Sequence, residues 1–176
     1  MYDVKEFWFT GAKRPVHGFL LKPYGFKPTE TYPLAFLIHG GPESAWNNDW
    51  GLRWNQQVFA GAGYVVITIN PTGSTGYGSQ FTKDIMNEWG SLPFVDLMNG
   101  LDYAISQFKY IDSGRMCALG ASYGGYMINW INGHTDRFKC LVNHDGIFDT
   151  TGSYYNSDEL WFPEMEVSFL FMLMVS

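Results

Sequence analysis

Two short, uncharged apolar segments constrain the fold of this chain most strongly. Leu34–Ile38 and Tyr64–Ile69 are each bounded by residues that break regular structure, Pro33 before the first and Gly63 before the second. A strand covered on both faces needs such a continuous run, whereas a strand with one wet face alternates. Helix-spaced apolar residues separate these runs from one another. The pattern predicts an α/β fold, with helices on both faces of an open, mostly parallel sheet.

The same periodicities place the other elements. Strands are expected at Glu6–Thr10, Val16–Lys22, Leu34–Ile38, Tyr64–Ile69, Met116–Leu119 and Cys140–Asn143, the first two as an antiparallel hairpin. One helix is expected around Trp54, Val58 and Phe59, two more after the Gly-rich segment 71–79, and a fourth at Tyr126–His134 with Met127, Trp130 and Ile131 inward. The third helix carries a core stripe of Phe94, Leu97, Met98, Leu101, Ile105 and Phe108.

Composition excludes several classes of protein. The 176 residues include 11 basic and 17 acidic side chains, with no basic cluster, which argues against nucleic-acid binding. The apolar run Val167–Val175 is less than half of the ~20 residues that a membrane-spanning helix needs, so no membrane span is expected. Aromatic residues make up 18% of the chain and charged residues only 16%. We therefore expect part of the apolar surface to contact another domain or chain.

The two cysteines are too few for a disulfide framework. Cys117 and Cys140 each lie in an apolar run that is expected to form a buried strand. Small buried thiols of this kind are usually inert. The sequence predicts two unreactive core thiols.

A Gly-Ala-Ser-Tyr-Gly-Gly segment at positions 120–125 follows an apolar strand and precedes an amphipathic helix. In that context, G-x-S-x-G predicts a nucleophile elbow, in which a sharp strand-to-helix turn lifts the serine hydroxyl above the sheet. Glycines two residues before and two after the serine leave room for close packing. Ser122 is therefore the candidate nucleophile, and an ordinary Gly-rich turn is the alternative.

The segment His39-Gly40-Gly41-Pro42 closes the strand at Leu34–Ile38, where a sheet of this kind supplies half of its oxyanion hole. Backbone N–H groups aimed at the oxygen of a tetrahedral intermediate stabilise its charge. We expect the two donors to be the Gly41 N–H and the Tyr123 N–H. The alternative is a simple Gly-Gly-Pro loop.

Other candidate sites are weaker. The segment Thr72–Gly78 lacks the Gly-Lys-Ser/Thr of a phosphate-binding loop, and we expect it to line the pocket instead. The four histidines lie on separate elements without paired ligand spacing, so no metal site is predicted: His17, His39, His134 and His144. His39 is expected to brace its own loop, and His134 to interact with a helix end. Three acids are expected on the surface or at the pocket rim: Asp149, Asp158 and Glu159.

Five ordered blocks resemble the catalytic domain of the prolyl oligopeptidase family of serine peptidases. They are HGGP at 39–42, NPTGSTGYG at 70–78, Trp89-Gly90 followed by Asp96-Leu97, GASYGGYM at 120–127 and DELWFP at 158–163. The likeness is greatest to the branch that contains fungal dipeptidyl-peptidase V and acylaminoacyl-peptidase. Thr72 departs from the pattern, because many relatives have Arg there.

This resemblance implies an α/β-hydrolase domain packed under a β-propeller that is missing from this chain. It implies Ser122 as the nucleophile, peptide substrates cleaved near their amino ends, and no metal or organic cofactor. Residues 1–166 are interpreted as a partial catalytic domain, and 167–176 as an apolar tail foreign to the family. The first twenty residues show no signal-peptide pattern. The fungal relatives imply secretion, with a cytoplasmic location as the alternative.

The catalytic triad is incomplete in this sequence. Acyl transfer needs a histidine as general base and a carboxylate to orient it, and in this fold both follow the serine. The family places them after strands seven and eight, and only six strands are predicted here, so the triad Asp and His are expected to be absent. His144, with Asp145 beside it, is the candidate surrogate base, and a structural histidine is the favoured interpretation. A carboxylesterase and a non-catalytic fragment remain the alternatives to a peptidase.

Overall fold

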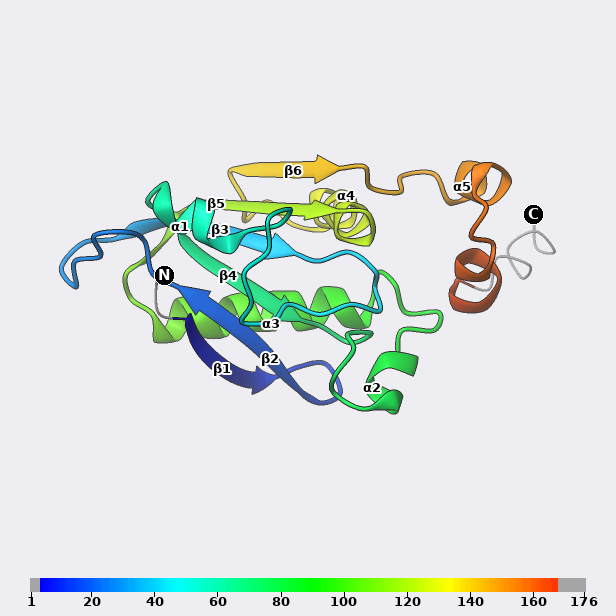
Figure 1. Cartoon of the computed structure of the whole chain (residues 1–176), viewed down its shortest axis with the longest axis horizontal. Coiled ribbons are helices and arrows are strands. Elements are labelled where there is room, and N and C mark those ends of the chain that lie inside the picture. Colours follow the sequence, from blue (N-terminus) through cyan, green and yellow to red (C-terminus); the bar gives the residue numbers. More distant parts are fainter. Residues whose placement is uncertain (1–3, 168–176) are drawn as a thin grey trace.

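The computed structural model describes residues 4–167 and contains a six-stranded sheet in the order β1-β2-β4-β3-β5-β6 (Figure 1). The strands are β1 (Val4–Thr10), β2 (Pro15–Leu21), β3 (Tyr32–Ile38), β4 (Val65–Asn70), β5 (Ile111–Ala121) and β6 (Cys140–His144). The helices are α1 (Gln56–Gly61), α2 (Ser79–Lys83), α3 (Leu92–Gln107), α4 (Tyr123–His134), α5 (Thr150–Asn156) and a π-helical turn, η1 (Phe162–Glu166).

The topology confirms the predicted alternation. β1 and β2 form the antiparallel hairpin, and β2 runs antiparallel to β4. The pairs β3–β4, β3–β5 and β5–β6 are all parallel. The carboxyl ends of these parallel strands therefore meet along one edge, and α5 lies beyond that edge (Figure 1).

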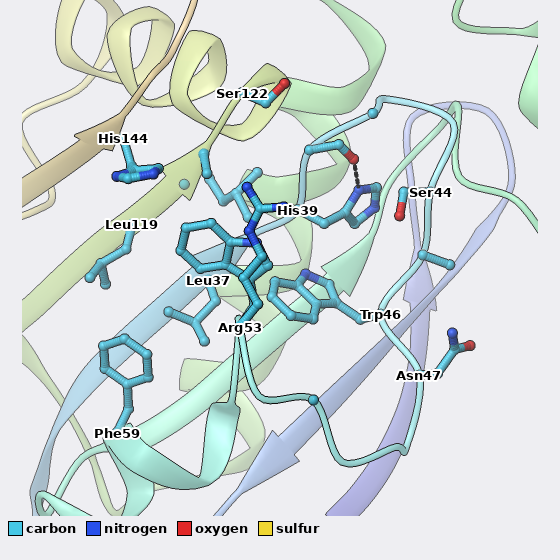
Figure 2. Close-up of a pocket in the computed structure, with 18 of the residues that line it drawn as sticks. Leu37, His39, Ser44, Trp46, Asn47, Arg53, Phe59, Leu119, Ser122 and His144 are labelled. Carbon is cyan, nitrogen blue, oxygen red and sulfur yellow. Dashed lines mark hydrogen bonds between the residues drawn. The ribbon is translucent and has the colours of Figure 1, made fainter.

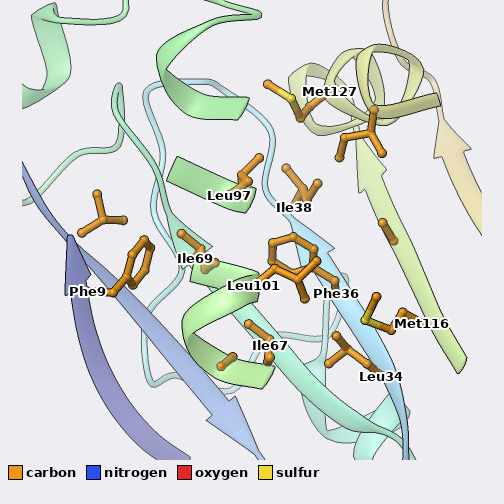
Figure 3. Close-up of a cluster of buried hydrophobic side chains, with 14 of the residues drawn as sticks. Phe9, Leu34, Phe36, Ile38, Ile67, Ile69, Leu97, Leu101, Met116 and Met127 are labelled. Atoms are coloured by element: carbon orange, nitrogen blue, oxygen red, sulfur yellow. The ribbon is translucent and has the colours of Figure 1, made fainter. Parts of the chain in front are cut away.

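Helices cover both faces of the sheet, as predicted. On one face, α3 and α4 bury a large core that includes Phe36 and Ile67 of the sheet, Leu97 and Leu101 of α3, and Met127 of α4 (Figure 3). On the other face, Ala60 of α1 packs in a smaller cluster with Leu21, Ala35, Leu37 and Val66. The core stripe predicted for α3 is confirmed, since its most buried members are fully enclosed.

Two helices begin at other positions than the sequence suggests. α1 begins at Gln56, because the Asn55 side chain accepts a hydrogen bond from the Gln57 N–H at 2.9 Å and caps the helix. Trp54, which was expected in this helix, lies before its first turn, and Trp54 and Val58 are 46% and 65% exposed. α4 begins at Tyr123, three residues earlier than predicted, because the serine of the elbow is itself the residue before the first helical turn.

The prediction of two buried free thiols is wrong. Cys117 and Cys140 form a disulfide across β5 and β6. They are paired in register, and their Cα atoms lie 4.7 Å apart, within the range that a disulfide spans. Cys140 is also exposed, because β6 lies at the edge of the described sheet and most of its residues are open to solvent.

We expect this disulfide to be detectable by mass spectrometry of a non-reduced digest. The peptides that contain Cys117 and Cys140 should appear joined, and should separate on reduction. Closing a loop across a sequence separation of 23 should stabilise the fold by about 3 kcal/mol. Alkylation of either cysteine in an unreduced, denatured sample would contradict the pairing.

The predicted apolar tail falls largely on 168–176, outside the described residues. Across residues 4–167, no helix has the length and apolar character required to cross a lipid bilayer.

Candidate functional site

Ser122 lies at a sharp turn between the end of β5 and the start of α4. Its φ of 56° and ψ of −122° are unusual for a residue with a side chain, and the residue is exposed. The turn is held by the Ser122 N–H, which donates to the His144 carbonyl at 3.0 Å. The hydroxyl is thus presented to solvent by a fixed backbone at the edge where the parallel strands end, as the elbow motif predicts.

The flanking glycines are required by close backbone contacts. A Cβ on Gly120 would lie 2.3 Å from the Gly124 carbonyl oxygen, and one on Gly124 would lie 2.3 Å from the Ile38 carbonyl oxygen. Both contacts are far shorter than carbon and oxygen tolerate, and both involve backbone. Only glycine therefore allows α4 to start directly against β5 and β3.

The loop after β3 lies against the serine. A Cβ built on Gly40 would lie 3.2 Å from the Ser122 Cβ and 3.8 Å from its Oγ. Across residues 4–167, neither the Gly41 N–H nor the Tyr123 N–H has a hydrogen-bond partner. The Tyr123 amide is among the first N–H groups of α4, which have no acceptor within the helix.

His39 braces this loop, as predicted (Figure 2). Its Nδ1 lies 2.7 Å from the Gly40 carbonyl oxygen, and because a carbonyl can only accept, Nδ1 carries the proton. Burial lowers the pKa of His39. Its Nε2 lies 3.0 Å from the Ser74 hydroxyl oxygen, and that hydroxyl donates its own proton to the Pro71 carbonyl at 2.7 Å. A trans peptide points its C=O and N–H in opposite directions. By holding the Gly40 carbonyl, His39 therefore sets the direction of the Gly41 N–H.

A pocket of about 880 Å³ opens beside Ser122. Its lining includes His39, Trp46, Arg53 and His144, whose side chains surround the cavity in Figure 2. The segment Thr72–Gly78 does not line this pocket, so that part of the prediction is wrong.

The Gly-rich segment instead supports the site from behind. Ser74 bonds His39, and the Tyr77 hydroxyl accepts from the Asn70 side-chain amide at 2.7 Å. Asn70 in turn holds the backbone of Trp46 through both its amide oxygen (2.7 Å) and its nitrogen (3.0 Å). Sequence reasoning missed Asn70, although an amide side chain at the end of a buried strand was a usable signal.

Thr72 is tied to a buried carboxylate of α3. Its backbone N–H and its hydroxyl donate to Asp96 Oδ2 at 2.8 and 2.6 Å, and the Ala12 N–H donates to Oδ1 at 2.6 Å. Burial raises the pKa of Asp96, and these hydrogen bonds oppose the rise. Asp96 thereby joins the hairpin, the loop after β4 and α3.

His144 lines the pocket without bonding the serine hydroxyl. Its Nε2 lies 3.2 Å from Asp145 Oδ2. Its ring meets the Trp54 ring edge to face, with the ring centroids 5.4 Å apart. Both the His144 and the Asp145 side chains are exposed. The geometry favours the structural interpretation of His144.

The other predicted residues take structural or surface positions. His134 Nδ1 lies 2.7 Å from the Trp130 carbonyl at the end of α4, as expected. Asp149 caps α5 by accepting from the Thr151 N–H at 2.9 Å, and Asp158 and Glu159 are exposed, as predicted for surface acids. Across residues 4–167, no group of three or more His, Cys, Asp or Glu side chains is placed to hold a metal ion.

Comparison with known proteins agrees with this geometry. The chain is 48% identical over 161 residues to dipeptidyl-peptidase 5 of Schizosaccharomyces pombe and 49% identical over 166 residues to the probable dipeptidyl-peptidase 5 of Emericella nidulans. These alignments cover 90% and 93% of this chain but only 24% and 23% of the relatives. The chain thus spans about a quarter of their length.

Among solved structures, the acylaminoacyl peptidase of Pyrococcus horikoshii superposes with a TM-score of 0.88 at 30% identity, covering 94% of this chain and 27% of that one. A puromycin hydrolase shares the fold, with a TM-score of 0.87 at 22% identity over 99% of this chain and 27% of that chain. The described sheet is thus part of an α/β-hydrolase domain, as expected. The prolyl oligopeptidase family matches residues 50–170. This chain belongs to the prolyl oligopeptidase family of serine peptidases.

Proposed function

We propose that Ser122 is the nucleophile of a peptidase that cleaves short peptides near their amino ends through an acyl-enzyme. The observation that carries this proposal is the approach of the Gly40–Gly41 loop to an exposed serine on a strained turn. Such a turn separates the hydroxyl from the sheet and brings it close to backbone donors.

In this proposal, the Gly41 N–H and the Tyr123 N–H form the oxyanion hole. Both amides lack a partner among residues 4–167, so they are free to donate to the oxygen on which negative charge develops, without breaking other hydrogen bonds. His39 supports the Gly41 donor through the Gly40 carbonyl. Each donor of this kind is typically worth about 2.7–4 kcal/mol in the barrier.

The general base and its carboxylate are proposed to come from sequence beyond this chain. The curated relatives are about four times longer, and the exposed edge strand β6 is where two further strands would pair. A histidine following those strands would take the Ser122 proton, and an acid would hold its tautomer. Without them, the isolated chain is proposed to be inactive, since the His144 ring makes no hydrogen bond to the Ser122 hydroxyl through which it could take the proton.

The substrate class is proposed from the relatives. They are named dipeptidyl-peptidase 5 and acylaminoacyl peptidase, and one solved relative is described in complex with Z-Gly-Gly-Phe-chloromethyl ketone. A β-propeller partner would cover apolar surface such as Phe148, which is 87% exposed. Secretion is proposed by analogy with the fungal relatives, and a cytoplasmic location is the alternative.

Two assays on the full-length protein test this function. A fluorophosphonate probe should label Ser122, because labelling requires an activated serine, and dipeptidyl or acylaminoacyl amides should be hydrolysed. Hydrolysis of p-nitrophenyl esters without any amide hydrolysis would favour a carboxylesterase of the same fold. Failure of the probe to label the full-length protein would favour a non-catalytic role. The isolated 176-residue chain should not be labelled.

A further inference from the structure

Glu166 is a buried carboxyl group that the proposed reaction does not use. It ends η1 and is only 4% exposed. Its Oε2 accepts a hydrogen bond from the Trp89 indole Nε1 at 2.8 Å, and its backbone carbonyl accepts from the Asn87 N–H at 2.5 Å. Burying a carboxyl group costs several kcal/mol unless its polar atoms are satisfied or it is neutral. The buried Glu166 carboxyl group therefore needs a hydrogen-bond partner for its other oxygen, and burial favours its protonated form.

The second partner is Glu43, whose side chain hydrogen-bonds that of Glu166. Two carboxyl groups can form such a bond only when one of them holds a proton. Burial, with the contribution of Glu43, raises the pKa of Glu166 from 4.5 to about 8. At neutral pH Glu166 thus carries the proton and donates it to a Glu43 carboxyl oxygen.

This pair connects the two sides of the proposed oxyanion hole. Glu43 follows Gly41 by two residues on the loop after β3. On the other side, the backbone carbonyl of Trp89 accepts from the Tyr123 hydroxyl at 2.7 Å, and the two rings meet edge to face at 5.1 Å. Tyr123 is only 1% exposed, so this contact fixes the first residue of α4.

We infer that Glu166 is a positioning residue for the oxyanion hole, because its side chain joins the Gly41 loop, through Glu43, to Trp89 and thence to Tyr123. This inference rests on the proposed function. It assigns Glu166 no contact with the substrate, and its effect passes entirely through the two backbone donors.

The connection depends on pH. Above about pH 8 Glu166 ionises, its bond to Glu43 is lost, and two like charges face each other. Among residues 4–167, burial also raises the pKa values of Tyr123 and Tyr126 above their usual 10, away from this range. Burial raises the pKa of Asp96 as well, and its carboxylate accepts hydrogen bonds from the Ala12 and Thr72 N–H groups. Because the folded pKa of Glu166 exceeds its unfolded value, this group also lowers stability as pH rises between 4.5 and about 8.

The pair can be tested without any activity measurement. In full-length protein labelled with 5-fluorotryptophan, the Trp89 ¹⁹F resonance, assigned with Trp89→Phe, should shift with a midpoint near pH 8. Glu166→Gln should abolish that shift. Glu164→Gln is the matched control, because Glu164 is an exposed acid on the same turn, and it should leave the midpoint unchanged. A Trp89 resonance that does not move between pH 6 and 10 would overturn the inference.

The positioning role is tested by kinetics on the same variants. The wild-type kcat should fall as pH rises through about 8, beyond any effect on KM. Glu166→Leu should lower kcat roughly 10- to 100-fold, because a small displacement of a catalytic group has effects of that size. Glu166→Gln can accept from Trp89 and donate to Glu43, so it should recover most of that loss and remove the alkaline fall.

The outcomes separate this inference from the proposed function. If the wild type hydrolyses amides but Glu166→Gln keeps the wild-type pH profile, or Glu166→Leu keeps the wild-type kcat, the positioning role is wrong and the peptidase stands. If the wild type hydrolyses nothing, the proposed function fails, and the role of Glu166 at an oxyanion hole fails with it.

Discussion

Ser122→Ala should lower the kcat of the full-length protein for a dipeptidyl or acylaminoacyl amide by about 10⁴- to 10⁶-fold. The hydroxyl is exposed on a strained turn beside the Gly40–Gly41 loop, and alanine offers no oxygen in its place. The KM should change little, because the hydroxyl contributes mainly to the transition state. The measurement is steady-state kinetics together with fluorophosphonate labelling, which the substitution should abolish.

Ser106→Ala is the matched control for this prediction. Ser106 lies in α3, where its hydroxyl donates to the Tyr103 carbonyl at 2.7 Å within the same helix. Its loss should leave kcat within about a factor of two, as for most exposed substitutions. Retention of substantial amide hydrolysis by Ser122→Ala would show that another group is the nucleophile.

The second large effect is on stability, and it is expected from substitution of two glycines of α4, the helix that follows Ser122. Gly124→Ala should destabilise the domain by about 3 kcal/mol, because the new methyl group would lie 2.3 Å from the Ile38 carbonyl oxygen and backbone must move to admit it. Gly133→Ala should instead stabilise it by about 0.5–1 kcal/mol, since a Cβ there meets no atom within 4 Å and alanine favours the helix.

The comparison is made by urea denaturation of both variants, followed by tryptophan fluorescence. Both changes replace a glycine of α4 by alanine, so both gain the same helix propensity. The difference between their unfolding free energies therefore reports the contact of Gly124 with β3. Gly124→Ala should also displace the turn at Ser122, and probe labelling should fall with it. Equal unfolding free energies for the two variants would show that α4 does not approach β3 as closely as described.

Local sequence patterns were sufficient to predict the parallel strands and the nucleophile elbow at Ser122. The apolar runs at β3 and β4 and the alternation with helices each depend on residues close together in the chain, where periodicity is informative. The same holds for the bracing of the loop by His39, which bonds the residue next to it. The limits of α1 were less accurate, because its start depends on a single capping side chain, Asn55.

Contacts between distant residues were not accessible in the same way. Cys117 and Cys140 bond because two strands pair in one register, and a shift of one residue would send their side chains to opposite faces. Asn70 and Trp46 are 24 residues apart, yet the Asn70 side chain holds the backbone of Trp46, which lines the pocket. The burial that raises the pKa of Glu166 also comes from packing, which no local pattern encodes.

The order of residues alone determined that this chain forms a mostly parallel α/β sheet and that a serine lies between a strand and a helix, because both follow from short-range spacing of apolar residues and glycines. Only the tertiary structure decided which groups meet around that serine. Glu166 reaches Trp89 across 77 residues, and Asp96 reaches Ala12 across 84. Such meetings depend on strand order and on how the loops pack at one edge of the sheet, and these are properties of the whole fold.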